Sequence, residues 1–369
     1  MERFNLKRRN GMGRMQLSLF ALAGLSLLLA HGLRLPLAGS RATGILAFLG
    51  GLVVTAVAIK LVAGAADIGR TTDFDRYVNA AIISAEAEPA PIIAFSGASY
   101  SRNGIDPERL TLALRERGYP HQVVNLSIEA ASILERDKHL SQFITGAGRT
   151  PDIVFVEVAQ DFDHRAAYMF GNSKFNARAI EQYDLATTAW TSFGILGGAC
   201  QGVKGCVLDA GFLTAHSVLN FFNVGLIGSG ETPASVGAVP AYDPQFQPRA
   251  ESVTEQAFER IDQAPVDGPQ WVRSYRVQQR NRLLEQGVRS VAYYQPPALS
   301  PETRAYADAL CRGELVDQIC LSPDDPSLMA DLSGDYWFDP SHLLDTGTAI
   351  YNAWLVDQII ASGILEPAS

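Results

Sequence analysis

Positive charge is scarce in this sequence. The 369 residues include 30 lysines and arginines against 39 aspartates and glutamates, which gives a formal net charge of −9. No basic stripe follows the N-terminal residues, whereas a protein that binds nucleic acid needs a cationic face for the phosphates. We therefore expect no nucleic-acid partner.

Cysteine is also rare, with four residues in the whole chain. They form two close pairs, Cys200 with Cys206 and Cys311 with Cys320, and neither pair has the two-residue spacing of a zinc knuckle or a redox dithiol. Two local disulfides would fit an oxidising compartment, which favours a location outside the cytoplasm. The alternative is four unrelated buried thiols.

Long hydrophobic runs are missing from most of the chain and are confined to its N-terminal part. They cover residues 15–33 and 43–66, and each is about the length of a membrane-spanning helix, roughly 20 residues. We predict a membrane anchor at residues 1–66 with one or two transmembrane helices, then a linker at 67–89. The alternative is a buried hairpin in a soluble core.

The orientation of this anchor follows from its charges. The basic N-terminus should stay in the cytoplasm. A single crossing would then place the following domain outside the cytoplasm, and two crossings would return the domain to the cytoplasm. The cysteine pairs favour the single crossing. We expect a protein of a bacterial-type inner membrane with its globular domain on the periplasmic side and not in the cytoplasm.

Short apolar runs alternate with helical patterns from residue 90 onward, and this alternation predicts an α/β domain over residues 90–369. Strands are expected near residues 90–95, 121–126, 152–158, 289–294 and 319–321. Helices are expected near residues 106–118, 133–144, 271–286, 301–311 and 346–360. Such alternation indicates right-handed crossovers and a mostly parallel sheet. The pattern breaks at about 166–265, which we interpret as an insertion that is either a lid or docking surface, or a passive excursion.

A serine stands at the carboxyl end of the first expected strand, where open α/β sheets keep their sites. Gly97 permits a sharp turn there, and Ser99 follows it. Serine needs a neighbouring base to act as a nucleophile, usually a histidine oriented by a carboxylate. Asp339 and His342 supply both groups in a short loop before the last expected helix. We predict Ser99, His342 and Asp339 as a catalytic triad.

Three other interpretations stay open at this point. Ser96 or Ser101 could be the nucleophile, because both flank the same turn. Arg102 could hold an anionic or sugar substrate, or it could be a solvated surface arginine. The carboxylates and the imidazole of the Asp161–His164 segment could bind a metal ion, although no further ligand is evident in the sequence.

Four blocks of this chain, spread over residues 92–360, resemble the SGNH (GDSL-like) hydrolase superfamily. The family's Gly-Asp-Ser, Asn-x-Gly, Gly-x-Asn-Asp and Asp-x-x-His blocks correspond to Gly97-Ala98-Ser99, Asn125-Leu126-Ser127, Val158-Ala159-Gln160-Asp161 and Asp339-Pro340-Ser341-His342. The resemblance implies a three-layer α/β/α fold with a mostly parallel, flavodoxin-like sheet.

The same resemblance implies the chemistry. The triad carries over, and the oxyanion hole would consist of the Ser99 and Ser127 amides and the Gln160 side chain. Asn125 and Arg102 are secondary candidates for contact with the substrate. No cofactor is expected.

The expected function is that of a divergent, membrane-anchored member that resembles envelope polysaccharide O-acyltransferases and esterases. It would carry out serine-dependent ester chemistry on a cell-envelope glycan. The lipid bilayer and a membrane-bound acyltransferase are the candidate partners. Because the second and third blocks are altered, one alternative is a catalytically weak module that binds glycan or such a partner. Another alternative is a hydrolase of lipids or small esters.

Overall fold

A five-stranded parallel sheet forms the centre of the domain. In the computed structural model, the residues described are 50–58, 73–128, 131, 133–158, 188–189, 192, 202–221, 260–268 and 270–365. The strands are β1 (Ile92–Ser96), β2 (Gln122–Asn125), β3 (Ile153–Glu157), β4 (Ser290–Tyr294) and β5 (Cys320–Leu321). Their order is β2-β1-β3-β4-β5, and every neighbouring pair is parallel. The predicted flavodoxin-like parallel sheet is confirmed.

The strand order places a topological switch point between β1 and β3. The chain passes from β1 to β2 on one side and then returns to β3 on the other side. The crossovers that leave such a point diverge, so a crevice forms outside the carboxyl ends of the two strands, and ligands bind there in open α/β folds. Ser99 follows β1 at this position.

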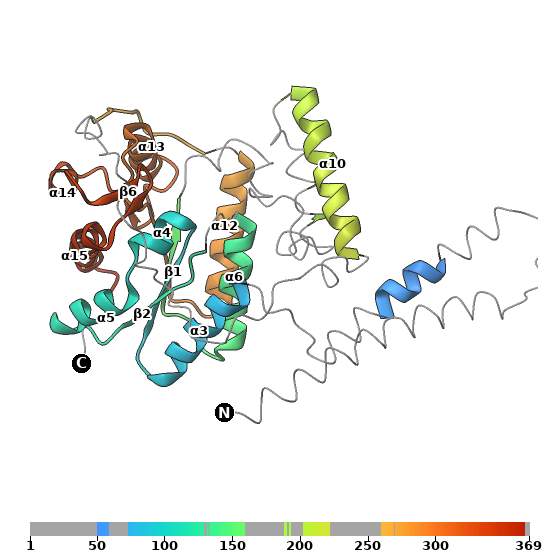
Figure 1. The fold of residues 1–369 in the computed structure, drawn as a ribbon, viewed down its shortest axis with the longest axis horizontal. Coiled ribbons are helices and arrows are strands. Elements are labelled where there is room, and N and C mark those ends of the chain that lie inside the picture. Colours follow the sequence, from blue (N-terminus) through green and yellow to red (C-terminus); the bar gives the residue numbers. More distant parts are fainter. Residues whose placement is uncertain are drawn as a thin grey trace, which may run out of the picture.

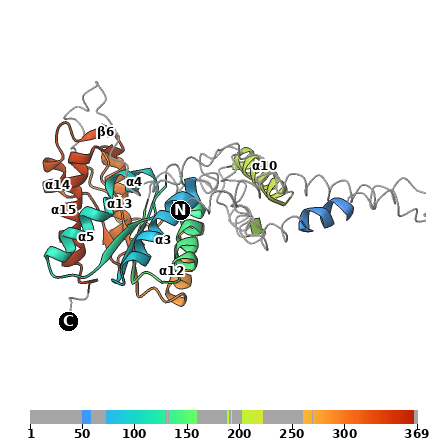
Figure 2. The same cartoon turned by 60° about the horizontal axis from the view of Figure 1, so that its bottom comes forward.

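Helices cover both faces of the sheet, which gives the three layers (Figures 1 and 2). One side carries α3 (Asp73–Ala87), α6 (Ile133–Gly146), α12 (Gln270–Glu285) and α13 (Pro301–Arg312). The other side carries α4 (Ser99–Gly104), α5 (Pro107–Glu116), α14 (Pro326–Asp331) and α15 (Asp345–Ala361). Strand residues alternate between the two cores, as the period of two in a strand requires: Ile93 and Phe95 face the second set of helices, and Ile92 and Ala94 face the first set.

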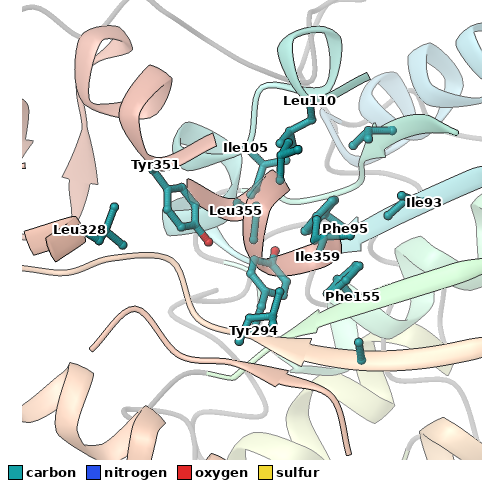
Figure 3. Close-up of a cluster of buried hydrophobic side chains, with 14 of the residues drawn as sticks. Ile93, Phe95, Ile105, Leu110, Phe155, Tyr294, Leu328, Tyr351, Leu355 and Ile359 are labelled. Carbon is teal, nitrogen blue, oxygen red and sulfur yellow. The ribbon is translucent and has the colours of Figure 1, made fainter. Parts of the chain in front are cut away.

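Aromatic side chains fill the core between the sheet and α15 (Figure 3). The rings of Phe95 and Phe155 stack with their centroids 4.9 Å apart, and the Tyr294 ring meets Phe95 edge-on at 5.1 Å. All three side chains are fully buried, together with Tyr351 and Leu355 of α15. The C-terminal helix is therefore packed directly on the strands that end at the predicted site.

The predicted linker at 67–89 is wrong over residues 73–87. These residues form α3, whose Val78, Ala81 and Ala85 are buried at helical spacing against α6 and β2. The Arg149 guanidinium also donates to the carbonyl oxygens of Ala85, Glu88 and Ala90, which ties the end of the helix to the sheet. The alanine-rich composition that suggested a connection is what lets α3 approach α6 closely.

Most of the predicted anchor and of the predicted insertion lies outside the described residues. Within the second apolar run, residues 50–58 are helical, and Val54 is 69% exposed. In the part of the insertion that is described, α10 (Gly202–Phe221) is a helix of 20 residues. None of the helices in the described part of the chain is both long and apolar enough to cross a membrane.

The predicted cysteine pairing at the C-terminal side is present. Cys311 near the end of α13 and Cys320 in β5 form a disulfide with their Cα atoms 5.4 Å apart. Cys206 is disulfide-bonded as well. The alternative of four unrelated thiols is therefore wrong.

Side chains of α15 bind the carbonyl groups at the end of α4. Asn352 Nδ2 donates to the Gly104 carbonyl at 2.6 Å, and Asn352 Oδ1 accepts from the Asp106 amide at 3.0 Å. The Thr348 hydroxyl donates to the Asn103 carbonyl at 2.8 Å. These buried bonds join segments about 245 residues apart in the sequence and fix the serine helix to the C-terminal helix.

We expect Asn352→Ala to lower the free energy of unfolding by about 2 kcal/mol, because it leaves the Gly104 carbonyl and the Asp106 amide buried without this partner. Urea denaturation of the full chain measures this loss. Gln358→Ala on the same helix is the matched control, since the side chain of Gln358 makes no hydrogen bond to any other described residue, and it should change the free energy by less than about 0.5 kcal/mol. Equal losses for the two variants would contradict this role of Asn352.

Candidate active site

A tight turn after β1 presents the predicted nucleophile. Ala98 is extended, with φ −102° and ψ −152°, and Ser99 is the first residue of the short helix α4. The Arg102 amide donates to the Ala98 carbonyl at 2.9 Å and closes the first helical turn. A β-carbon at Gly97 would collide with the Glu157 carboxylate and the Ser101 side chain. Glycine is therefore required by this close approach and not by unusual backbone angles, because Gly97 does not have a positive φ.

The predicted base and its carboxylate lie on a two-stranded antiparallel hairpin of β6 (Trp337–Asp339) and β7 (His342–Leu343). His342 Nδ1 is 2.8 Å from Asp339 Oδ1 and 2.9 Å from Oδ2. Since a carboxylate only accepts hydrogen bonds, Nδ1 carries a proton, and in the neutral imidazole Nε2 is then the acceptor nitrogen. The Ser341 amide donates to Asp339 Oδ1 at 2.8 Å and holds the carboxylate in place.

The serine helix and the histidine hairpin pack against each other. The ring of Tyr100, the residue after Ser99, lies 5.6 Å from the His342 ring between centroids, and α4 contacts β7. The side chains of Asp339 and His342 are about one-fifth exposed, so substrate can reach them. Between the described residues Ser99 and His342 there is no hydrogen bond. Catalytic hydrogen bonds commonly form only with substrate bound.

Burial excludes the two alternative nucleophiles. The Ser101 hydroxyl is fully buried, where it donates to Glu157 and accepts from the Tyr294 hydroxyl at 2.6 Å. Ser96 is 1% exposed, and its hydroxyl faces the Arg136 carbonyl. Ser99 is partly exposed and is the hydroxyl of this turn that an ester could reach.

The second sequence block has a structural role. Asn125 is 1% exposed, and its Nδ2 donates to the Ser101 and Ile105 carbonyls at 3.1 and 2.8 Å. Its Oδ1 accepts from the Ser127 amide at 3.0 Å. Two predictions need correction here: Asn125 fixes the end of α4 and does not reach a substrate, and the Ser127 amide is already engaged and is not a free oxyanion donor.

The remaining predicted residues have different outcomes. Arg102 is 6% exposed, so the alternative of a solvated surface arginine is wrong, and its contact with substrate stays a prediction. Gln160 and the Asp161–His164 segment lie outside the described residues. Within the part of the chain that is described, no group of histidine, cysteine and carboxylate side chains could hold a metal ion.

A buried carboxylate beneath the serine turn was not predicted from the sequence. Glu157 ends β3, its side chain is 0% exposed, and its Oε2 accepts from the Ala98 amide at 2.9 Å and from the Ser101 hydroxyl. Arg136 Nη1 lies 3.3 Å from Glu157 Oε1. Burial and the charge of Glu157 raise the pKa of Tyr294 well above its usual value, so its hydroxyl stays protonated and donates to Ser101. The available signal was a single charged residue in the otherwise apolar run 153–158.

Comparisons with known proteins add little to this geometry. No protein-family model matches the sequence, and no curated protein is significantly similar to it. One similar solved structure is a crystal structure of the lipase/acylhydrolase from Enterococcus faecalis, with 10% sequence identity and a TM-score of 0.28. The similarity covers 76% of this chain and 99% of that chain. At this TM-score the similarity carries no argument, and the function is inferred from the site.

We expect Gly97→Ala to destabilise the protein by about 1–3 kcal/mol, because the added methyl group must displace Glu157 or Ser101 in a packed environment. Gly104→Ala at the other end of α4 is the matched control, since its β-carbon would meet Tyr351 at an ordinary 3.7 Å. Urea denaturation of both variants measures the difference. A Gly97→Ala protein as stable as the Gly104→Ala protein would show that the turn does not need glycine.

Proposed function

We propose that this chain is a serine-dependent ester hydrolase or O-acyltransferase. The observation that supports the proposal most strongly is the Asp339–His342 pair, which is oriented by two short contacts and stands beside Tyr100, next to Ser99. A serine at a strand end, a histidine and a carboxylate that orients it are the three parts that acyl transfer needs.

The proposed reaction has two half-reactions. Ser99 Oγ attacks the ester carbonyl carbon while His342 Nε2 takes the hydroxyl proton, and Asp339 stabilises the imidazolium that forms. The tetrahedral intermediate collapses, and the alcohol leaves with the proton from His342. Water or an acceptor hydroxyl then attacks the acyl-serine and gives its proton to His342. The second tetrahedral intermediate collapses, the acid or the new ester is released, and Ser99 Oγ leaves with the proton from His342.

The stabilisation of the oxyanion is the part of this proposal with the least support. Removing one oxyanion donor typically costs on the order of a hundredfold to a thousandfold in rate. With the Ser127 amide held by Asn125, the proposed donors are the Ser99 amide and the Gln160 side chain. A slow or selective enzyme fits this arrangement better than a fast general esterase.

The second candidate is a catalytically weak module that binds a glycan or a membrane-bound acyltransferase. Two observations favour it: the Ser127 amide is engaged within the protein, and the described residues Ser99 and His342 share no hydrogen bond. The same fold and the same surface would then serve recognition alone.

A fluorophosphonate probe separates the two candidates. We expect the full chain to be labelled at Ser99, as identified by peptide mass spectrometry, and labelling to vanish in Ser99→Ala. Asp339→Asn should slow labelling on the order of 10³- to 10⁴-fold, because the imidazole loses the carboxylate that fixes its tautomer.

Asp335→Asn is the matched control, because Asp335 is an exposed carboxylate in the turn just before β6. It should be labelled at the wild-type rate. A wild-type chain that does not react would favour the binding module, and labelling that survives Ser99→Ala would move the nucleophile to another residue.

The cellular setting is part of the proposal. We propose an N-terminal anchor in a bacterial-type inner membrane, a catalytic domain outside the cytoplasm, and an acylated envelope glycan as substrate. The Cys311–Cys320 disulfide supports an oxidising compartment. Alkaline phosphatase fused after Ser369 should be active in a bacterial host, whereas an active cytoplasmic reporter at that position would reverse the orientation.

A further inference from the structure

The buried carboxylate of Glu157 binds the chain on both sides of Ser99. Its Oε2 atom accepts from the amide of Ala98, one residue before the serine, and from the hydroxyl of Ser101, two residues after it. A single carboxylate oxygen accepts both bonds, one on each of its two lone pairs. Bonds of this kind are charge-assisted and are about twice as strong as neutral ones.

The carboxylate is itself held from two directions. Arg136 of α6 approaches its Oε1 at 3.3 Å and also donates to the Glu157 carbonyl at 3.2 Å. A buried charge is tolerated only when it is paired and hydrogen-bonded, and this pair meets both conditions. On the other side, Tyr294 of β4 donates to the Ser101 hydroxyl, which leaves the Ser101 proton directed at Glu157.

The position of Glu157 in the sheet explains why it can do this. β1 and β3 are parallel neighbours with Ser96 in register with Val156, so Glu157 lies one residue further, opposite Gly97. The absence of a side chain at Gly97 lets the carboxylate reach the turn. This is the switch point of the sheet, where β1 and β3 diverge into different crossovers.

We propose that Glu157 is the positioning residue of the nucleophile: its carboxylate holds the Ala98 amide and the Ser101 hydroxyl and thereby sets the direction of Ser99 Oγ toward His342. This inference rests on the proposed function. The carboxylate that binds the serine turn is that of Glu157, at the end of β3. The turn has no carboxylate of its own at position 98, which is an alanine.

The test uses Glu157→Gln, which keeps the size of the side chain and removes its charge. The amide nitrogen would face either Arg136 or the Ala98 amide, and both are donors, so at least one contact is lost. A nucleophile displaced by about 1 Å can lose on the order of 100-fold in rate. We expect the second-order rate constant for fluorophosphonate labelling of the full chain to fall about 10- to 100-fold. For hydrolysis of p-nitrophenyl acetate, kcat should fall and KM should stay within about twofold.

Glu314→Gln is the matched control. Glu314 is also a buried carboxylate that pairs with an arginine, Arg276 at 3.1 Å, and accepts from a backbone amide, Gly268 at 2.9 Å. We expect both variants to melt at a lower temperature and only Glu157→Gln to react slowly. An equal loss of reactivity in both would show that stability, and not positioning, limits the rate.

The outcomes separate this inference from the proposed function. If the wild type is not labelled, the proposed function fails and the inference fails with it. If the wild type and Glu157→Gln are labelled at equal rates, the inference alone fails. Should Glu157→Gln not fold, Ser101→Ala takes its place: it removes one of the two contacts, we expect about a tenfold slower labelling, and a wild-type rate would overturn the proposal.

Discussion

The hydrogen bonds between α15 and the end of α4 are the constraint on which the site depends. Thr348 and Asn352 bind the last two carbonyls of α4, groups that a short helix leaves without partners. The bonds are buried between the sheet and the C-terminal helix, so breaking them would leave polar groups unsatisfied in an apolar core. They fix the serine helix against the segment that also carries the histidine hairpin.

The sheet supplies the second half of this arrangement. Parallel strands end at the same edge, and the switch between β1 and β3 opens space for a turn and for a side chain beneath it. The serine turn lies in this space, and Glu157, paired with Arg136, contacts the turn from its buried side. One face of the turn is therefore held by ionic hydrogen bonds, and the other face is open to substrate.

Local patterns in the sequence predicted the regular part of this fold well. The apolar runs located all five strands, and the last helix was expected at 346–360 and is found at Asp345–Ala361. The Asp339–His342 contact was also predictable, because three residues of a tight hairpin bring the two side chains together without help from distant segments.

What sequence reasoning missed depends on contacts between distant segments. The helix α4 has no apolar stripe and is held by Asn125, Thr348 and Asn352, which are brought to it by the fold. Glu157 lies 59 residues from the amide it binds, and nothing local marks that partnership. Asn125 matched a family block, yet the structure uses the block to support the turn, so a matching residue type did not establish its role.

The central claim is that the first third of the globular chain and its C-terminal hairpin meet at one site. Nuclear Overhauser effects between the ring protons of Tyr100 and His342 test it most directly, in full-length protein labelled selectively on tyrosine and histidine. A ring separation of 5.6 Å predicts clear cross-peaks between the two side chains. Assigned spectra of the folded protein with no such cross-peaks would place Ser99 and His342 in separate parts of the molecule and contradict the account.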